Sequence, residues 1–266
     1  MKVIICATPD DVGRLAAARI ANICGAAGPE PVLGVATGSS PLSTYSELAR
    51  WVQAGRLDLS HAHAFALDEY VGLPAGHPQS YATVIDATVT RPLRLDPAHV
   101  HVPPGHAEDV DGACADYEHR IKAVGGVDIQ VLGVGTNGHI GFNEPTSSLG
   151  SRTRIKTLTA QTRLDNARFF DDPQEVPRYC LTQGLGTIMD ARRLVLVAQG
   201  ESKARAVAAL VEGPVTALVP GSVLQLHPHA TVIVDEAAAS LLTLAAYYRD
   251  VFAGMPSWQR DPALAF

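Results

Sequence analysis

The chain has 266 residues, of which 47% are hydrophobic and 18% charged, and its formal net charge is −6. This balance is typical of a globular protein with a full core. The acidic charge and the lack of a basic stripe argue against nucleic-acid binding. No apolar run approaches the roughly 18 residues that span a bilayer. The four cysteines have no CxxC spacing and no signal peptide is evident, which predicts a reduced, cytoplasmic protein.

Apolar runs alternate with helical patterns along the whole chain. In chain order, strands are expected at 3–6, 31–35, 63–67, 129–134, 194–198 and 231–234, and helices at 9–24, 42–51, 110–124, 159–170, 182–191, 201–212 and 237–252. Residues 71–107 are expected to wrap the outside with one helix. This alternation predicts one α/β domain over residues 1–266, with a doubly wound, mainly parallel sheet in a Rossmann-like three-layer sandwich.

The strand at 31–35 runs into a loop of small residues before the helix at 42–51. Thr37, Gly38, Ser39 and Ser40 form this loop, and Pro41 stands at the start of the helix. Such a loop offers several backbone N–H groups and the positive end of a helix dipole to an anion. An ordinary capped helix start is about as common, and the loop does not match the GxxxxGK[ST] motif of nucleotide hydrolases.

Two adjacent acids, Asp68 and Glu69, follow the strand at 63–67. Because side chains alternate across an extended segment, only one of the two is expected to face a given ligand. The alternative is that both acids are solvated at the mouth of a loop.

The strand at 129–134 breaks into the glycine-rich segment VLGVGTNGHIGFNEP, residues 131–145. Its glycines allow the backbone to turn sharply and to approach a ligand closely. Asn137, His139, Asn143 and Glu144 lie within this bend. An open α/β sheet binds ligands where a strand ends in such a loop, although the segment can also be a tight turn whose polar groups serve only its own backbone.

The ends of the three strands near Thr37, Asp68 and Gly135 are expected to share one edge of the sheet. An anion-binding loop, a carboxylate and a His–carboxylate pair would then line one crevice. Asp68 and His139 are suited to proton transfer, which indicates a sugar-phosphate isomerase-like enzyme. This chemistry needs no thiol, metal or cofactor, and the scattered histidines show no metal-ligand spacing.

Six ordered segments resemble the glucosamine-6-phosphate deaminase family. The resemblance extends from the first strand to the last helix and implies conversion of glucosamine 6-phosphate and water to fructose 6-phosphate and ammonium. The segments are LGVATGSSP (33–41), LDEYVGL (67–73), GVGTNGHIGFNEP (133–145), SRTRIKTLT (151–159), TRLDNARFF (162–170) and GESKARAV (200–207).

The resemblance also implies roles for individual residues. Asp68 would shuttle a proton between C1 and C2, and His139, oriented by Glu144, would assist opening of the sugar ring. Asn137 stands where many members have Asp and others have Asn. The substrate phosphate would lie on the loop of Thr37, Gly38, Ser39 and Ser40, with Arg168 and Lys203 as cationic partners.

Some members of this family are hexamers that N-acetylglucosamine 6-phosphate activates from a second site. Ser147, Arg154 and Lys156 match positions that bind the phosphate of this effector, whereas Arg193 stands where an acidic contact would be expected. The residues alone show only that Arg152, Arg154 and Lys156 alternate along an extended segment, which is either an anion-binding face or a solvated one. A hexamer is the favoured oligomer, and motion of residues 155–182 as a lid is left open.

Two alternatives to this function remain. One is a non-catalytic sugar-phosphate-sensing domain, against which the absence of a DNA-binding segment and the presence of Asp68 and His139 argue. The other is a related lactonase, or an isomerase or deaminase for another sugar phosphate such as galactosamine 6-phosphate.

Overall fold

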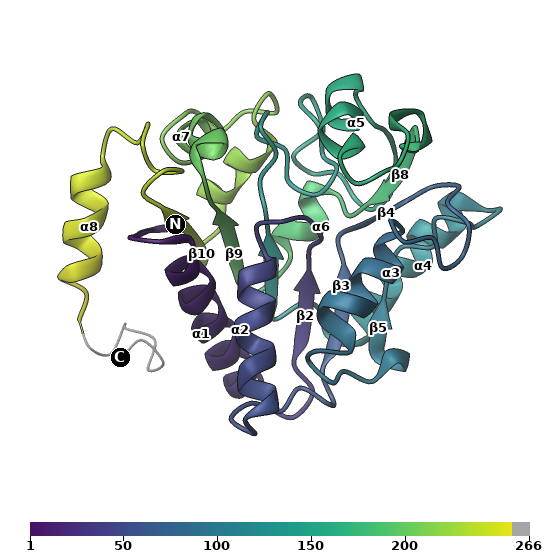
Figure 1. The fold of residues 1–266 in the computed structure, drawn as a ribbon, viewed down its shortest axis with the longest axis horizontal. Coiled ribbons are helices and arrows are strands. Elements are labelled where there is room, and N and C mark those ends of the chain that lie inside the picture. Colours follow the sequence, from purple (N-terminus) through teal and green to yellow (C-terminus); the bar gives the residue numbers. More distant parts are fainter. Residues whose placement is uncertain (257–266) are drawn as a thin grey trace.

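A seven-stranded parallel sheet forms the centre of the molecule in the computed structural model, which describes residues 1–256 (Figure 1). Its strands follow the order β1-β10-β9-β6-β2-β3-β5, and all six pairings are parallel. The strands are β1 (Lys2–Cys6), β2 (Val32–Val35), β3 (His63–Ala66), β5 (Val100–His101), β6 (Ile129–Leu132), β9 (Leu194–Ala198) and β10 (Ala230–Asp235).

Helices cover both faces of this sheet and form the three-layer α/β sandwich that the sequence predicts. The helices of the described residues are α1 (Pro9–Ala27), α2 (Leu42–Gln53), α3 (Tyr81–Ile85), α4 (Val110–Ala123), α5 (Ala160–Ala167), α6 (Leu185–Met189), α7 (Ala204–Val211) and α8 (Ala245–Ala253), of which α5 lies beyond the carboxyl ends of the strands rather than on a face of the sheet (Figure 1). One apolar core joins α1 and α2 to the sheet, and a second core joins α4, α6 and α7 to the sheet. The four cysteines are buried and form no disulfide.

The order of the strands reverses between β2 and β6, which are neighbours in the sheet. From β2 the chain continues through β3 to β5 on one side, and from β6 it continues through β9 to β10 on the other side. The loops that follow β2 and β6 therefore diverge and leave a crevice at the carboxyl ends of the strands. Open α/β sheets bind their ligands at such a switch point.

A second, three-stranded sheet lies beside this crevice. It consists of β4 (Asp68–Tyr70), β8 (Tyr179–Thr182) and β7 (Arg154–Thr157), paired antiparallel in the order β4-β8-β7. Strand β8 is not predicted from the sequence, whose pattern places Thr182 in a helix instead. That helix begins only at Leu185, because Thr182 pairs with both Asp68 and Arg154 in the sheet. These partners are distant in the chain, so local periodicity does not reveal them.

Other helix boundaries also differ from the prediction, and the expected helix at 159–170 ends already at Ala167. Helix α1 continues past Gly25 to Ala27, and its C-cap is Gly28, which has a φ of 106°. The expected helix at 201–212 starts with a 3₁₀ turn, so that α7 begins only at Ala204. The expected helix at 237–252 is reduced to α8, because the backbone amides of Thr243 and Leu244 donate to the carboxylate of Glu212 instead of starting a helix earlier.

Residues 71–107 contain α3, a π-helix (Asp86–Thr90) that continues it, a 3₁₀ turn (Pro97–His99) and the unpredicted edge strand β5. Within residues 1–256, none of the helices combines the length and the apolarity that crossing a bilayer requires.

Candidate active site

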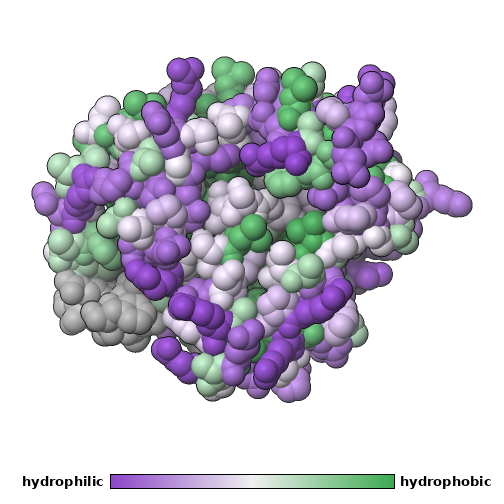
Figure 2. Space-filling model, viewed as in Figure 1, coloured by the Kyte–Doolittle hydropathy of each residue, from purple (hydrophilic) through white to green (hydrophobic). Residues whose placement is uncertain are grey.

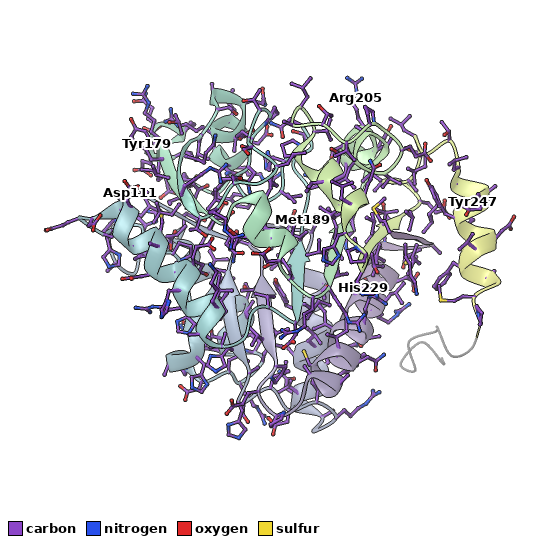
Figure 3. All side chains as sticks on the ribbon, turned by 180° about the vertical axis from the view of Figure 1, so that it is seen from behind. Asp111, Tyr179, Met189, Arg205, His229 and Tyr247 are labelled. Atoms are coloured by element: carbon purple, nitrogen blue, oxygen red, sulfur yellow. The ribbon has the colours of Figure 1, made fainter. Side chains whose placement is uncertain are left out.

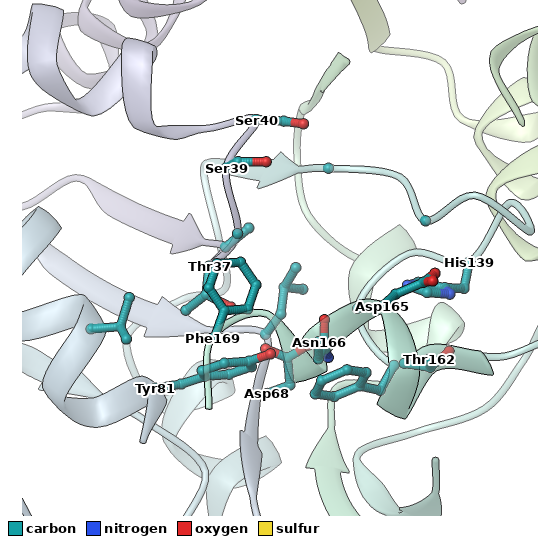
Figure 4. Close-up of a pocket in the computed structure, with 18 of the residues that line it drawn as sticks. Thr37, Ser39, Ser40, Asp68, Tyr81, His139, Thr162, Asp165, Asn166 and Phe169 are labelled. Carbon is teal, nitrogen blue, oxygen red and sulfur yellow. The ribbon is translucent and has the colours of Figure 1, made fainter. Parts of the chain in front are cut away.

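A cavity of about 320 Å³ lies at the carboxyl ends of the central strands. Its walls come from the loops that follow β2, β3, β6 and β9, and from α3 and α5 (Figure 4). On the face shown in Figure 2, pale and green residues gather near the centre and purple residues surround them. Residues 37–40, Asp68 and His139 all line this cavity, so the predicted convergence of the three loops on one pocket is confirmed.

The loop after β2 forms one end of this cavity. Thr37, Gly38, Ser39 and Ser40 all line it, and Figure 4 shows the hydroxyls of Ser39 and Ser40 at the end remote from Thr162. Gly38 has a φ of 95°, which glycine adopts without strain. The loop leads directly into the N-terminus of α2 at Leu42, so the helix dipole favours an anion at this end of the cavity.

Asp68 and Glu69 have different surroundings, as the alternation of side chains predicts. Asp68 lines the cavity and is only 6% exposed. Burial, and to a smaller extent the neighbouring charge of Glu69, raises the pKa of Asp68 to about 8. Glu69 accepts hydrogen bonds of 2.8 Å from the backbone amides of Tyr70, Tyr81 and Ala82, so this acid supports the start of α3.

Glycines shape the loop that follows β6. A Cβ atom on Gly135 would lie 2.2 Å from the imidazole ring of His139, so only glycine leaves room for this ring. Gly141 has a φ of 55°, and a Cβ atom there would meet the hydroxyl of Thr182 at 2.9 Å. The loop is thereby folded tightly enough that both Gly141 and His139 line the same cavity as Asp68.

His139, Asn137 and Glu144 form a group in which only His139 lines the cavity. Nδ1 of His139 lies 3.7 Å from Oε2 of Glu144, which is too long for a hydrogen bond but close enough for an ion pair. Asn137 donates through Nδ2 to the same oxygen at 2.7 Å. Glu144 is buried, and Asn143 is buried and donates to the carbonyls of Ile140 and Gln183, so Asn143 holds the bend rather than a ligand.

The surroundings of Glu144 favour its charged form. Burial by itself would raise the pKa of this carboxylate, but His139 and hydrogen bonds from Thr162 and Asn137 lower it to about 2. A charged carboxylate therefore lies next to the one member of this group that lines the cavity, the imidazole of His139.

Two cations complete the cavity wall. Arg168 follows α5, Lys203 follows β9, and both line the cavity. Burial and the positive charge of Arg168 lower the pKa of Lys203. The residues alone did not single out these two cations, although Lys203 follows a strand that ends at the same edge of the sheet as Asp68 and His139.

Several residues that line the cavity have no signal in the sequence. Tyr81, Thr162, Asp165, Asn166 and Phe169 line the cavity (Figure 4). Asn166 donates to the hydroxyl of Tyr70 at 2.9 Å, and Asp165 accepts from the hydroxyl of Thr136 at 3.2 Å. Most of these residues belong to a polar helix, which has no pattern that distinguishes a pocket wall from a solvated surface.

The candidates for a second site lie outside this cavity. Arg154 and Lys156 are half-buried on the same face of β7, and Ser147 is buried with a hydroxyl that has no hydrogen-bond partner in the described residues. Arg152 does not extend this cationic face as the sequence predicted. Its guanidinium instead forms ion pairs with Glu118 and Asp190, which anchor the start of the segment to α4 and α6.

Comparisons with known proteins give one consistent family. A family model described as glucosamine-6-phosphate isomerases/6-phosphogluconolactonase matches residues 7–234. A glucosamine-6-phosphate deaminase of Cutibacterium acnes is 61% identical over 249 residues, which are 94% of this chain and 95% of that protein. A Streptomyces avermitilis protein of the same name is 58% identical over 260 residues, which are 97% of this chain and 99% of that protein.

Solved structures show the same fold. A monomeric glucosamine-6-phosphate deaminase superposes with a TM-score of 0.87 at 41% identity, over 91% of this chain and 100% of that chain. A 6-phosphogluconolactonase from Trypanosoma cruzi has a TM-score of 0.70 at 20% identity, over 91% of this chain and 97% of that chain, and shares the fold alone.

Proposed function

Because this chain belongs to the family of glucosamine-6-phosphate isomerases and 6-phosphogluconolactonases, we propose that it is a glucosamine-6-phosphate deaminase. It converts glucosamine 6-phosphate and water to fructose 6-phosphate and ammonium. Relatives that are 61% and 58% identical over nearly the full chain carry this name. The observation that carries the proposal is that the loop of residues 37–40, Asp68 and His139 line one cavity.

In this proposal the phosphate binds at the end of the cavity formed by residues 37–40. Backbone amides and hydroxyls of this loop, with the α2 dipole, stabilise the anion, and Arg168 and Lys203 neutralise its charge. The half-buried Lys203 next to Arg168 supports this role, because two cations held together in a cavity favour an anionic ligand.

His139 transfers the proton that opens the pyranose ring. Glu144 orients its imidazole from the Nδ1 side, and Asn137 donates a hydrogen bond to the same oxygen of Glu144. Asp68 then removes the proton from C2 of the open-chain sugar and returns it to C1. This converts the aldose into a ketose imine, which water hydrolyses to fructose 6-phosphate and ammonium. Asp68 must be charged to accept the proton, and the ammonium group of the substrate favours the charged carboxylate.

Ammonium release from glucosamine 6-phosphate tests this function. Purified protein should release ammonium and fructose 6-phosphate in equal amounts, and Asp68→Asn should release them at least ~10²-fold more slowly. Parallel rates with galactosamine 6-phosphate and 6-phosphogluconolactone decide between the proposal and the related activities, because recognition of one hydroxyl can be worth orders of magnitude. Binding of sugar phosphates without turnover would instead indicate a sensing domain.

A hexamer and activation by N-acetylglucosamine 6-phosphate are further parts of the proposal. Ser147, Arg154 and Lys156 support an anion site because two half-buried cations share a face of β7. Exposed apolar residues that suit subunit contacts lie at opposite ends of the molecule, with Tyr179 at one end and Tyr247 at the other (Figure 3). The mass in solution decides between this hexamer and the monomeric state of the similar structure. The cytoplasmic location stays a prediction.

A further inference from the structure

Helix α5 docks on the rest of the protein in an unusual way. Thr162 is its only buried residue, with 3% of its surface exposed, whereas its apolar residue Leu164 is 64% exposed. Helices of this length are usually held by an apolar face. Here the buried contact is polar, because the hydroxyl of Thr162 donates to Oε1 of Glu144.

The contact is part of a short chain of hydroxyl groups at the N-terminus of α5. The hydroxyl of Thr159 accepts from the backbone amide of Thr162 at 3.1 Å and so caps the helix. The same hydroxyl lies 3.1 Å from the hydroxyl of Thr162 and 3.5 Å from Oε1 of Glu144. The start of α5 is therefore built around one oxygen of this carboxylate.

The two oxygens of Glu144 consequently have different partners. Oε1 faces the threonines of α5, and Oε2 faces Nδ2 of Asn137 at 2.7 Å and Nδ1 of His139 at 3.7 Å. His139 forms an ion pair with this carboxylate. On β8, burial and then the charges of Asp68 and Glu144 raise the pKa of the Cys180 thiol. Glu144 is 4% exposed, so water cannot readily replace a lost partner.

We propose that Thr162 is a positioning residue of the active site, whose hydroxyl holds Glu144 so that the second carboxylate oxygen faces His139. This inference rests on the proposed deaminase activity. Helix α5 also leads into Arg168, the cation proposed to bind the substrate phosphate. The same segment therefore carries this cation and the hydroxyl that orients Glu144 toward His139. Thr162 thus links the two ends of the cavity.

Three substitutions test the role. Thr162→Val preserves the shape of the side chain and removes the hydroxyl, and Thr162→Ser keeps the hydroxyl. Thr44→Val is the matched control, since Thr44 is fully buried in α2, its hydroxyl has no hydrogen-bond partner in the described residues, and it does not line the cavity. Circular dichroism establishes the temperature range in which each variant is folded.

The first measurement does not depend on activity. Carbon-13 NMR of the Glu144 carboxyl group in the empty protein should show a pKa about one unit higher in Thr162→Val, because a hydrogen bond to the charged form is lost. Thr162→Ser and Thr44→Val should match the wild type. An unchanged titration in Thr162→Val would overturn the proposed contact even if the protein proved to have a different activity.

The second measurement is the rate of ammonium release. Thr162→Val should lower kcat about tenfold with KM nearly unchanged, since it disturbs a group that acts in the chemical steps. Thr162→Ser should restore most of the rate. Wild-type kcat in Thr162→Val, or an equal loss in Thr162→Ser and Thr162→Val, would show that Thr162 has only a packing role. Absence of ammonium release from the wild type would contradict the proposed function itself.

Discussion

Asp68 and Glu69 are adjacent in β4, but their carboxylates lie on opposite faces of the small sheet. Glu69 accepts hydrogen bonds from three backbone amides, whereas Asp68 lines the cavity, where burial raises its pKa to about 8. Glu69 therefore stabilises the fold, whereas Asp68 is placed to exchange a proton with a ligand in the cavity. This difference leads to the first two predictions.

Asp68→Asn should lower the rate of ammonium release by at least ~10², because it removes the proposed base. It should also stabilise the empty protein at alkaline pH. The folded pKa of Asp68 is above its unfolded value, so this group makes the protein progressively less stable as the pH rises from about 4 to 8. Melting temperatures at pH 5 and pH 9 check the stability: the melting temperature of Asp68→Asn should exceed that of the wild type by more at pH 9 than at pH 5. Near-normal turnover in Asp68→Asn would show that Asp68 is not the base.

The pH dependence of kcat/KM should reflect the same group. Since the free enzyme must carry a charged Asp68 to accept a proton, kcat/KM should rise with pH until about pH 8. NMR titration of the Asp68 carboxyl group in the empty protein identifies the group responsible. A flat profile between pH 6 and 8, with Asp68 already charged at pH 6, would contradict this assignment.

Lys203→Ala and Arg168→Ala should act mainly on binding. Each removes a cation that lines the cavity, so KM should rise by roughly 10-fold or more, and inorganic phosphate should inhibit less strongly. Arg205→Ala is the control, because Arg205 is an exposed cation two residues farther along the same segment and points outward (Figure 3). If the control raises KM as much as Lys203→Ala, general attraction rather than a phosphate site explains the effect.

Gly135→Ala should reduce both activity and stability, because the new methyl group would overlap the ring of His139. We expect at least a tenfold loss of kcat and a lower melting temperature. Gly25→Ala serves for comparison: Gly25 lies within α1 with open space around it, so this change should stabilise the protein by about 0.5–1 kcal/mol. Full activity in Gly135→Ala would mean that His139 need not occupy this position.

Arg154→Ala should leave the rate at saturating substrate largely intact and reduce the response to N-acetylglucosamine 6-phosphate. The residue lies on β7, outside the cavity that holds Asp68 and His139. Initial rates at low substrate, with and without the acetylated sugar phosphate, measure this response. If the wild-type protein does not respond to the effector, the second site proposed around Arg154 is wrong.

The sequence by itself was sufficient for the parallel core and for three of the loops that line the site. Apolar runs separated by amphipathic helices determine a parallel sheet, because each strand must return to the same edge. Thr37, Asp68 and His139 follow three such runs, so the topology places them together without knowledge of any contact between them.

Tertiary structure alone decided the features that depend on contacts between distant residues. Strand β8 forms because Thr182 pairs with Asp68 and Arg154. Helix α8 starts late because the carboxylate of Glu212 accepts from the two backbone amides just before the helix. The same holds for Thr162: in the sequence it is one polar residue among many, and only the fold shows that its hydroxyl donates to Glu144. The hydrophobic periodicity of a sequence indicates which face of a helix or strand is apolar. A polar contact between distant segments produces no such periodicity, so only the folded structure reveals that contact.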